Sequence, residues 1–178
     1  MTHKVLLGPD EFKLTLSRLC YELIENHNSF SDTVIIGIQP RGANVATRLA
    51  KQLQQITGNE ITAGNLDITF YRDDFRHQAE PLTAFDTTID FLIEGKKVVL
   101  VDDVLYTGRT IRAAMEALLQ FGRPESVELL VMIDRRYSRH LPIQPDYVGR
   151  VVDTIQSQKV KVEWAEHEGT DQVILLEQ

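Results

Sequence analysis

The sequence predicts an α/β fold with a mostly parallel sheet flanked by helices, and two observations lead to this prediction. Residues 34–38, 98–101 and 127–133 are short runs of aliphatic, largely β-branched residues, a pattern typical of strands buried on both faces. Between the second and third runs, apolar residues recur at helical spacing. A strand, a helix and a second strand in this order predict a parallel pair with a crossover helix.

Two further helices are expected before this unit. The first covers about residues 10–26, where apolar residues recur at steps of three and four and Asp10 can cap the start. The second follows Arg41 and Gly42 and ends at Gly58, a residue that suits the left-handed turn closing many helices. These two helices would cover the sheet.

The remaining chain predicts a strand, a long arm and a hairpin. Residues 66–70 alternate between apolar and polar and predict a strand. Residues 72–90 are polar and irregular and predict a long flexible arm or hairpin. Loops of that length in compact domains are usually functional. Residues 160–164 and 173–176, separated by a turn, predict a C-terminal antiparallel hairpin. All elements fit a single domain over residues 1–178.

Composition and charge exclude several classes of protein. The net charge of -7 argues against a globally basic nucleic-acid-binding protein, although a local basic face is compatible with it. The single cysteine, Cys20, excludes an internal disulfide, and its apolar helical setting predicts a buried packing role. No apolar stretch approaches the roughly 20 residues of a membrane span, and no signal peptide is expected. The prediction is a cytoplasmic protein.

The most informative chemical pattern follows the run at residues 98–101. Asp102 and Asp103 come directly after it, and the turn Thr-Gly-Arg-Thr at residues 107–110 leads into the next helix. A helix N-terminus offers unpaired N–H groups and a positive dipole end, and Gly108 lets an anion approach the backbone closely. The pattern predicts a phosphate cradle beside two acids that suit sugar hydroxyls or a divalent cation.

Residues 98–110 resemble the phosphoribosyl diphosphate (PRPP) binding motif of the type I phosphoribosyltransferases. The runs 67–74, 122–124, 133–135 and 141–149 resemble one subfamily, the pyrimidine operon attenuator proteins, which are also uracil phosphoribosyltransferases. This resemblance extends over about residues 16–162. It implies transfer of the phosphoribosyl group from PRPP to uracil, giving UMP and pyrophosphate, with Mg²⁺ carried by PRPP. It also implies a homodimer or homotetramer.

The resemblance assigns the parts of PRPP to separate segments. It implies that residues 107–110 hold the 5′-phosphate, that the two acids hold the ribose, and that the turn at Arg41 holds the pyrophosphate. Pro40 stands where the family usually has threonine, which removes one N–H and one hydroxyl from this turn. The expected PRPP site is Pro40, Arg41, Gly42, Asp102, Asp103, Val104, Leu105, Tyr106, Thr107, Gly108, Arg109 and Thr110.

Four of the expected residues would act in catalysis. Pyrophosphate would leave C1 of the ribose as positive charge builds on the ring, with Arg41 stabilising the leaving group and Asp102 or Asp103 orienting the sugar. Arg72 lies at the base of the arm that would close over the reaction, although an ion pair within the arm is an alternative role. Arg135 and Val160 are expected to bind the base.

The resemblance also implies a second function, binding of leader RNA. Arg18, Arg139 and Arg150 would supply the contacts. Other positions differ from the family, since Tyr21 stands where histidine is typical and Gln144 where arginine is. We therefore predict a transferase with weak or absent RNA regulation. Three alternatives stay open: an RNA-binding attenuator with little catalysis, a nucleotide-sensing module without catalysis, and a purine phosphoribosyltransferase.

Overall fold

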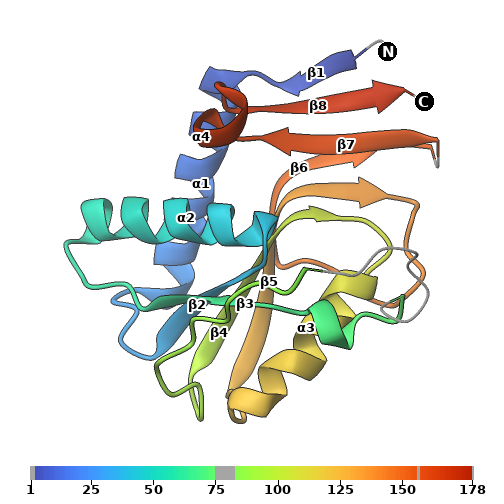
Figure 1. Cartoon of the computed structure of the whole chain (residues 1–178). Helices are drawn as coiled ribbons and strands as arrows, with labels where there is room; N and C mark the ends of the chain where they lie inside the picture. Colours follow the sequence, from blue (N-terminus) through green and yellow to red (C-terminus); the bar gives the residue numbers. More distant parts are fainter. Residues whose placement is uncertain (1–2, 75–82, 156, 178) are drawn as a thin grey trace.

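The computed structural model describes residues 3–74, 83–155 and 157–177, and its main feature is a sheet of five parallel strands (Figure 1). The strand order is β3-β2-β4-β5-β6, so the strand–helix–strand unit expected from the sequence joins neighbouring strands at the centre. The strands are β2 (Thr33–Ile38), β3 (Ala63–Leu66), β4 (Lys97–Leu105), β5 (Ser126–Arg136) and β6 (Tyr147–Asp153).

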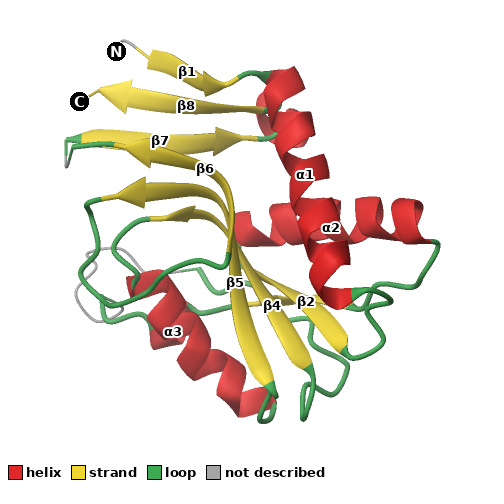
Figure 2. Cartoon of the chain, turned by 180° about the vertical axis from the view of Figure 1, so that it is seen from behind, coloured by secondary structure: helices red, strands yellow, loops and turns green. Residues whose placement is uncertain are grey.

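Helices cover both faces of this sheet (Figure 2). Helices α1 (Pro9–His27) and α2 (Arg41–Thr57) pack on one face, and α3 (Arg109–Leu118) packs on the other. Along the strands, alternate residues enter the two cores: Ile35 faces α1 and α2, whereas Ile36 faces α3. Two apolar faces explain why these strands appear in the sequence as continuous apolar runs. The α/β prediction is confirmed.

Cys20 lies on the buried face of α1, in the core that α1 and α2 form with the sheet, and it is fully buried. Burial raises the pKa of its thiol to about 12, so it stays protonated and inert near neutral pH. The predicted packing role of this cysteine is confirmed. No helix in the described part of the chain is long and apolar enough to cross a membrane.

A second, smaller sheet joins the two ends of the described chain (Figure 1). Its order is β1-β8-β7, all antiparallel, with β1 (His3–Leu7), β7 (Gln158–Glu163) and β8 (Gln172–Glu177). The predicted C-terminal hairpin is confirmed as β7 and β8, connected by the short helix α4 (Ala165–Glu168). Strand β1 was not expected, because most of its residues are exposed and it lies at the edge of the sheet.

The strand expected at residues 66–70 is wrong. Strand β3 ends at Leu66, and the 3-10 turn η1 (Thr69–Tyr71) follows it. The Asp67 carboxylate accepts hydrogen bonds from the backbone N–H of Thr69, at 3.1 Å, and from its hydroxyl, at 2.6 Å. A side chain that caps its own backbone in this way favours a turn over an extended strand.

The predicted arm at residues 72–90 is described only in part, because residues 75–82 lie outside the described residues. The described portions contain neither helix nor strand. The returning limb lies along the edge of β3: the Thr88 N–H donates to the Asn65 carbonyl at 2.9 Å, and the Asp67 N–H donates to the Thr87 hydroxyl at 3.0 Å. The described residues after the gap therefore cover the edge strand of the main sheet.

Candidate functional site

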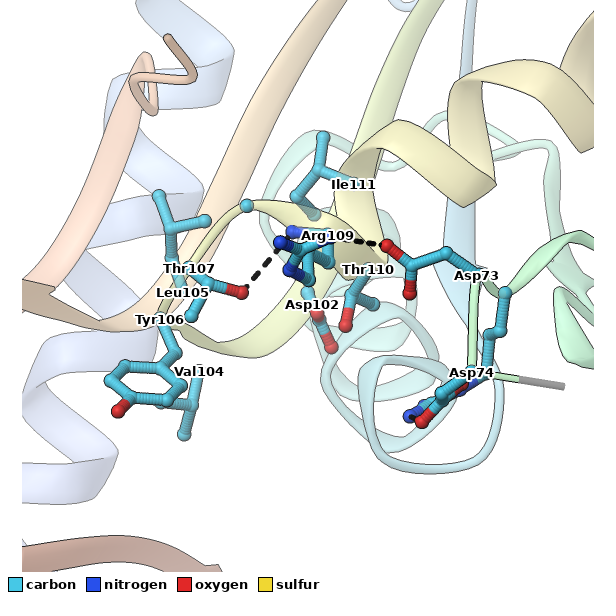
Figure 3. A pocket seen from close by; sticks show the side chains of 12 residues that line it. Asp73, Asp74, Asp102, Val104, Leu105, Tyr106, Thr107, Arg109, Thr110 and Ile111 are labelled. Carbon is cyan, nitrogen blue, oxygen red and sulfur yellow. Dashed lines mark hydrogen bonds and ion pairs between the residues drawn. The ribbon is translucent and has the colours of Figure 1, made fainter. Parts of the chain in front are cut away.

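A pocket of about 380 Å³ lies where β4 ends, α3 begins and the arm leaves the sheet (Figure 3). Parallel strands bring their carboxyl ends to one edge of a sheet, and ligands of open α/β folds bind there. This pocket brings the predicted phosphate turn, the first predicted acid and the base of the arm together. Its lining is Arg72, Asp73, Asp74, Asp102 and residues 104–111.

The phosphate turn has the geometry that its sequence predicts. Gly108 is the N-cap of α3 with a φ of 91°, a left-handed conformation that favours glycine. A Cβ added there would also lie 3.1 Å from Ile143 Cδ1. The Thr107 hydroxyl accepts a hydrogen bond from the Arg109 N–H at 3.4 Å, and its carbonyl accepts one from the His140 N–H at 2.9 Å. Residues 140–143 thus support the turn from behind.

Asp102 and Asp103 lie inside β4 rather than after it, and both are buried. One oxygen of each carboxyl accepts a hydrogen bond from the next backbone N–H, at 2.9 Å for Asp102 and 2.8 Å for Asp103. Burial raises the pKa of Asp102 well above its usual range, and the adjacent Asp103 raises it further. Burial also raises the pKa of Asp103, against the opposing effect of Arg41. Such carboxyl groups favour a cation or hydroxyl donors as partners.

A second pocket, of about 240 Å³, lies on the other side of Val104 and contains the predicted pyrophosphate turn. Arg41 Nη1 lies 4.0 Å from Asp103 Oδ2 and donates to the Val162 carbonyl at 2.9 Å. The predicted base residue Val160 lines the same pocket. Val104 lines both pockets, so the two are adjacent. The lining is Arg41, Asp103, Val104, Lys159, Val160 and Lys161.

Pro40 and Gly42 flank Arg41 at the start of α2, and among the described residues neither lines either pocket. Pro40 is the N-cap of α2, and the peptide bond that precedes it is cis. A Cβ at Gly42 would collide with the Val101 carbonyl of β4. Glycine therefore allows the start of α2 to approach the strand that carries the two acids.

Ion pairs hold the base of the arm against the phosphate turn. Arg72 donates two hydrogen bonds to the Asp74 carboxylate, at 2.8 and 2.7 Å, which is the intra-arm pair given above as its alternative role. Asp73 pairs with Arg109 across the pocket (Figure 3). Arg112 of α3 donates to the Tyr71 carbonyl at 2.7 Å. Arg72 thus lines the predicted pocket, with its guanidinium bound to a neighbour.

The predicted base contact by Arg135 differs from the observed geometry. Arg135 lies within β5, 5% exposed, and its guanidinium donates to the Thr154 hydroxyl at 2.8 Å and the Gln158 carbonyl at 2.9 Å. Among the described residues, the linings of both pockets omit Arg135. Its donors are directed to the chain between β6 and β7, because β5 continues past the point where the sequence suggested its end.

The three arginines expected to contact RNA all bind backbone carbonyls of the protein itself. Arg139 donates to the carbonyls of Tyr106, at 2.6 Å, and Ile143, at 2.9 Å, and also pairs with Asp134. Arg18 donates to a carbonyl of β6 at 3.1 Å, and Arg150 donates to one of β1 at 2.7 Å. This geometry favours structural roles, above all for Arg139.

Sequence reasoning missed five residues that line the pockets: Asp73, Asp74, Ile111, Lys159 and Lys161. Asp73 was not singled out, although it pairs with Arg109 of the phosphate turn. Lys159 and Lys161 line the pocket of Arg41. Their alternation with the apolar residues of β7 is a signal that could have indicated one polar and one buried face.

Comparison with known proteins identifies the family. The family model described as phosphoribosyl transferase domain matches residues 9–167. The proteins named bifunctional protein PyrR from Actinobacillus succinogenes and Bacillus velezensis are 45% and 44% identical over 177 residues, covering 97% of this chain and 98% and 96% of theirs. That of Enterococcus faecalis is 44% identical over 176 residues, covering 98% of this chain and 97% of its own.

Solved structures of phosphoribosyltransferases have the same fold as this chain. A hypoxanthine phosphoribosyltransferase from Staphylococcus aureus superposes with a TM-score of 0.72 at 20% identity, covering 98% of this chain and 92% of the other. One from Trypanosoma cruzi has a TM-score of 0.73 at 16% identity, with coverages of 98% and 96%. Since the family model spans most of the chain and the relatives match it along almost its whole length, this chain belongs to the phosphoribosyl transferase domain family.

Proposed function

We propose that this protein transfers the phosphoribosyl group of PRPP to uracil, forming UMP and pyrophosphate. The observation that carries the proposal is the pair of adjacent pockets on either side of Val104, one with a phosphate cradle and one with Arg41. PRPP has a phosphate at one end of its ribose and a pyrophosphate at the other. Two anion sites flanking two acids are suited to a molecule of that shape.

The two acids are suited to the ribose between these sites. Asp102 lines the first pocket and Asp103 the second. One oxygen of each accepts a backbone hydrogen bond, and the two carboxyl groups also interact with each other. Because a carboxyl group has several lone pairs, each acid can still accept a bond from a ribose hydroxyl. This arrangement would orient C1 of the sugar toward the pocket of Arg41.

The same donor set fits Mg²⁺ delivered with the substrate. Mg²⁺ prefers oxygen ligands and commonly binds through one or two carboxylates together with substrate phosphates. No group of three or more His, Cys, Asp or Glu residues that could hold a metal occurs among the described residues. The family resemblance implies an ion that arrives with PRPP. When bound, the ion would neutralise negative charge on the pyrophosphate.

The reaction would be a displacement at C1 of the ribose. The bond from C1 to the pyrophosphate oxygen breaks, N1 of uracil forms the new bond, and uracil releases its N1 proton. Arg41 would stabilise the departing pyrophosphate, and the buried carboxyl groups would face the positive charge that builds on the ring. Val160 lines the pocket of Arg41 and would contact the base there. In proteins that this chain resembles, the arm that begins near Arg72 closes over the reaction, which would exclude water.

A panel of bases tests this function. Purified protein is supplied with PRPP, Mg²⁺ and one of uracil, cytosine, hypoxanthine or guanine, and nucleotide formation is followed. We expect UMP from uracil and no product from the purines. Preferential use of hypoxanthine or guanine would identify a purine enzyme instead. Tight nucleotide binding without turnover of any base would identify a sensing module.

A second function, binding of a pyrimidine leader RNA, is favoured by one specific observation. The curated relatives that match almost the whole chain are named bifunctional proteins. Against strong binding, Arg139 is held by internal hydrogen bonds, and Arg18 and Arg150 each bind a backbone carbonyl. We therefore infer weak RNA binding. A homodimer or homotetramer and a cytoplasmic location stay predictions of the sequence.

Titration of leader RNA at two salt concentrations tests this inference. Weak binding predicts a dissociation constant in the micromolar range that rises steeply with salt, because phosphate contacts release counterions. A nanomolar complex at physiological salt that rejects an unrelated RNA would contradict it.

A further inference from the structure

Arg135 is a buried cation that contacts the chain between β6 and β7. Its Nε donates to the Thr154 hydroxyl at 2.8 Å, and its Nη2 donates to the Gln158 carbonyl at 2.9 Å and the Ile155 carbonyl at 3.4 Å. Gln158 begins β7, the strand that carries Val160 into the second pocket. The guanidinium thus holds both ends of the segment that leads to the predicted base residue.

The same guanidinium also lies over the ring of Tyr106, in the loop between β4 and α3. The carbon at its centre lies 4.0 Å from the ring centroid of Tyr106, within the range of a favourable cation–π contact. Tyr106 lines the first pocket next to the phosphate turn, as Figure 3 shows. Its carbonyl accepts a hydrogen bond from Arg139. Arg135 therefore touches the base side and the phosphate side of the site at once.

Burying the positive charge of Arg135 costs free energy, which indicates a role for this residue beyond packing. Burial lowers the pKa of Arg135, which means that the surroundings disfavour its charge. In the described part of the chain, its guanidinium contacts a hydroxyl, two carbonyls and a ring, and none of these carries a charge. A well-packed apolar side chain would stabilise the fold at lower cost than a buried cation. Arginine alone among side chains offers several fixed donors and a flat face that stacks on a ring.

We propose that Arg135 is a positioning residue for the base, which sets the distance between the strand carrying Val160 and the loop carrying Tyr106 without touching uracil. This inference rests on the proposed function and replaces the direct base contact expected from the sequence. It makes the stack between Arg135 and Tyr106 a determinant of base affinity.

The neighbouring pair Arg136 and Tyr137 provides a matched control. It is also a cation–π pair, but the guanidinium lies 5.7 Å from the ring centroid and Tyr137 is 86% exposed. Arg136 bonds to Asp153 at the surface, at 2.9 Å. Substitutions in this pair also remove a guanidinium and a phenol ring, but from residues that line neither of the two pockets.

The test compares Arg135→Lys and Tyr106→Leu with Arg136→Lys and Tyr137→Leu. For each protein, kcat, the KM for uracil and the dissociation constant of PRPP without base are measured. We expect Arg135→Lys to raise the KM for uracil about tenfold. This is the loss of affinity that corresponds to losing the stack on Tyr106 together with the hydrogen bonds of the guanidinium. The PRPP dissociation constant and kcat of this variant should change less than about twofold, within ordinary surface-substitution effects. Arg136→Lys and Tyr137→Leu should leave all three unchanged.

Two further measurements separate positioning from direct contact. The double variant Arg135→Lys with Tyr106→Leu should raise the KM for uracil by less than the product of the single effects, because both changes remove one contact. Arg135→Lys should raise the KM for uracil and for 4-thiouracil by the same factor. A factor that differs between these bases indicates a direct hydrogen bond to the carbonyl and overturns the inference, as does a fully multiplicative double variant.

Failure of this inference is distinguishable from failure of the proposed function. If the unmodified protein forms no UMP, uracil transfer is wrong. If it forms UMP and both Arg135→Lys and Tyr106→Leu bind uracil normally, only the positioning role is wrong. Should Arg135→Lys fail to fold, as judged by its thermal unfolding, Tyr106→Leu still decides the question, since its ring can be removed without burying an unpaired group.

Discussion

The carboxylate of Asp73 pairs with the guanidinium of Arg109, so an acid from the arm neutralises a cation of the phosphate turn (Figure 3). Both side chains are about half exposed, at 41% and 52%. An anion that enters this pocket must compete with Asp73 for Arg109.

Replacing Asp73 should therefore strengthen anion binding. We expect Asp73→Asn to lower the dissociation constant of inorganic phosphate by up to about fivefold, because exposed ion pairs contribute at most about 1 kcal/mol. Isothermal titration with phosphate measures this change. Asp153→Asn, which removes another exposed acid paired with an arginine, serves as the control and should leave the constant unchanged. Weaker phosphate binding by Asp73→Asn would show that Asp73 does not compete.

Gly108 should tolerate no larger residue. Gly108→Val introduces a β-branched residue at a φ of 91° and places its Cβ against Ile143 and Leu141. We expect the KM for PRPP to rise about tenfold or more, since the left-handed conformation alone costs about 1–2 kcal/mol. Gly58→Val has a similar φ of 71° with open space around it. That control should lose stability while keeping PRPP affinity; equal PRPP affinity in the Gly108 variant would rule out the cradle.

Asp103 should matter for turnover rather than for folding. Asparagine can still accept the hydrogen bond from the Val104 N–H, so the local fold of β4 has the same support. We expect Asp103→Asn to lower kcat about 100-fold, the typical effect of removing one electrostatic group at a reacting centre. Asp32→Asn, an exposed acid paired with Lys97, is the control. An Asp103 variant with normal kcat would mean that this carboxylate does not act on the sugar.

Asp102 should make the stability of the free protein depend on pH. Its pKa is higher in the folded chain than in the unfolded chain, so the folded state binds the proton more tightly. The stability linked to this proton is present below the unfolded pKa, near 4, and is lost as the pH rises through the folded pKa. Asp102→Asn removes the loss, because asparagine has no proton to release.

Urea denaturation of both proteins, without PRPP or Mg²⁺ and at several pH values between about 4 and 8, measures the difference in their free energies of unfolding. The other titrating groups are common to both proteins, so the difference reports on Asp102. The free energy of unfolding of Asp102→Asn should exceed that of the unmodified protein at the upper end and approach it at the lower end. A variant that is less stable at about pH 8 would show that the folded protein favours the charged carboxylate.

Prediction of the fold succeeded where each strand carries its own signal. Strands β2, β4 and β5 are buried on both faces, so their composition alone distinguishes them. Strand β6 was missed because it is an edge strand with Gly149 and Arg150 at its centre and several exposed residues. Strand β1 was missed for the same reason. Edge strands depend on the partner that they pair with, which a local pattern does not contain.

The phosphate turn and the acid pair were predictable because their chemistry is local. Residues 102–110 are contiguous, and a glycine that caps a helix beside threonine hydroxyls forms its geometry from neighbouring backbone groups. The sequence alone therefore determined the fold class and the position of the glycine turn at the start of α3, which we expect to hold the phosphate.

Only the tertiary structure decided how the arginines are used. Arg41 reaches the Val162 carbonyl, Arg139 reaches Tyr106, and Arg135 joins Tyr106 to Gln158. A guanidinium on a long side chain can bind a phosphate, a base, a carboxylate or a backbone carbonyl equally well in principle. Its partner is selected by segments that lie far away in the sequence, and those segments meet only when the sheet and its loops have packed.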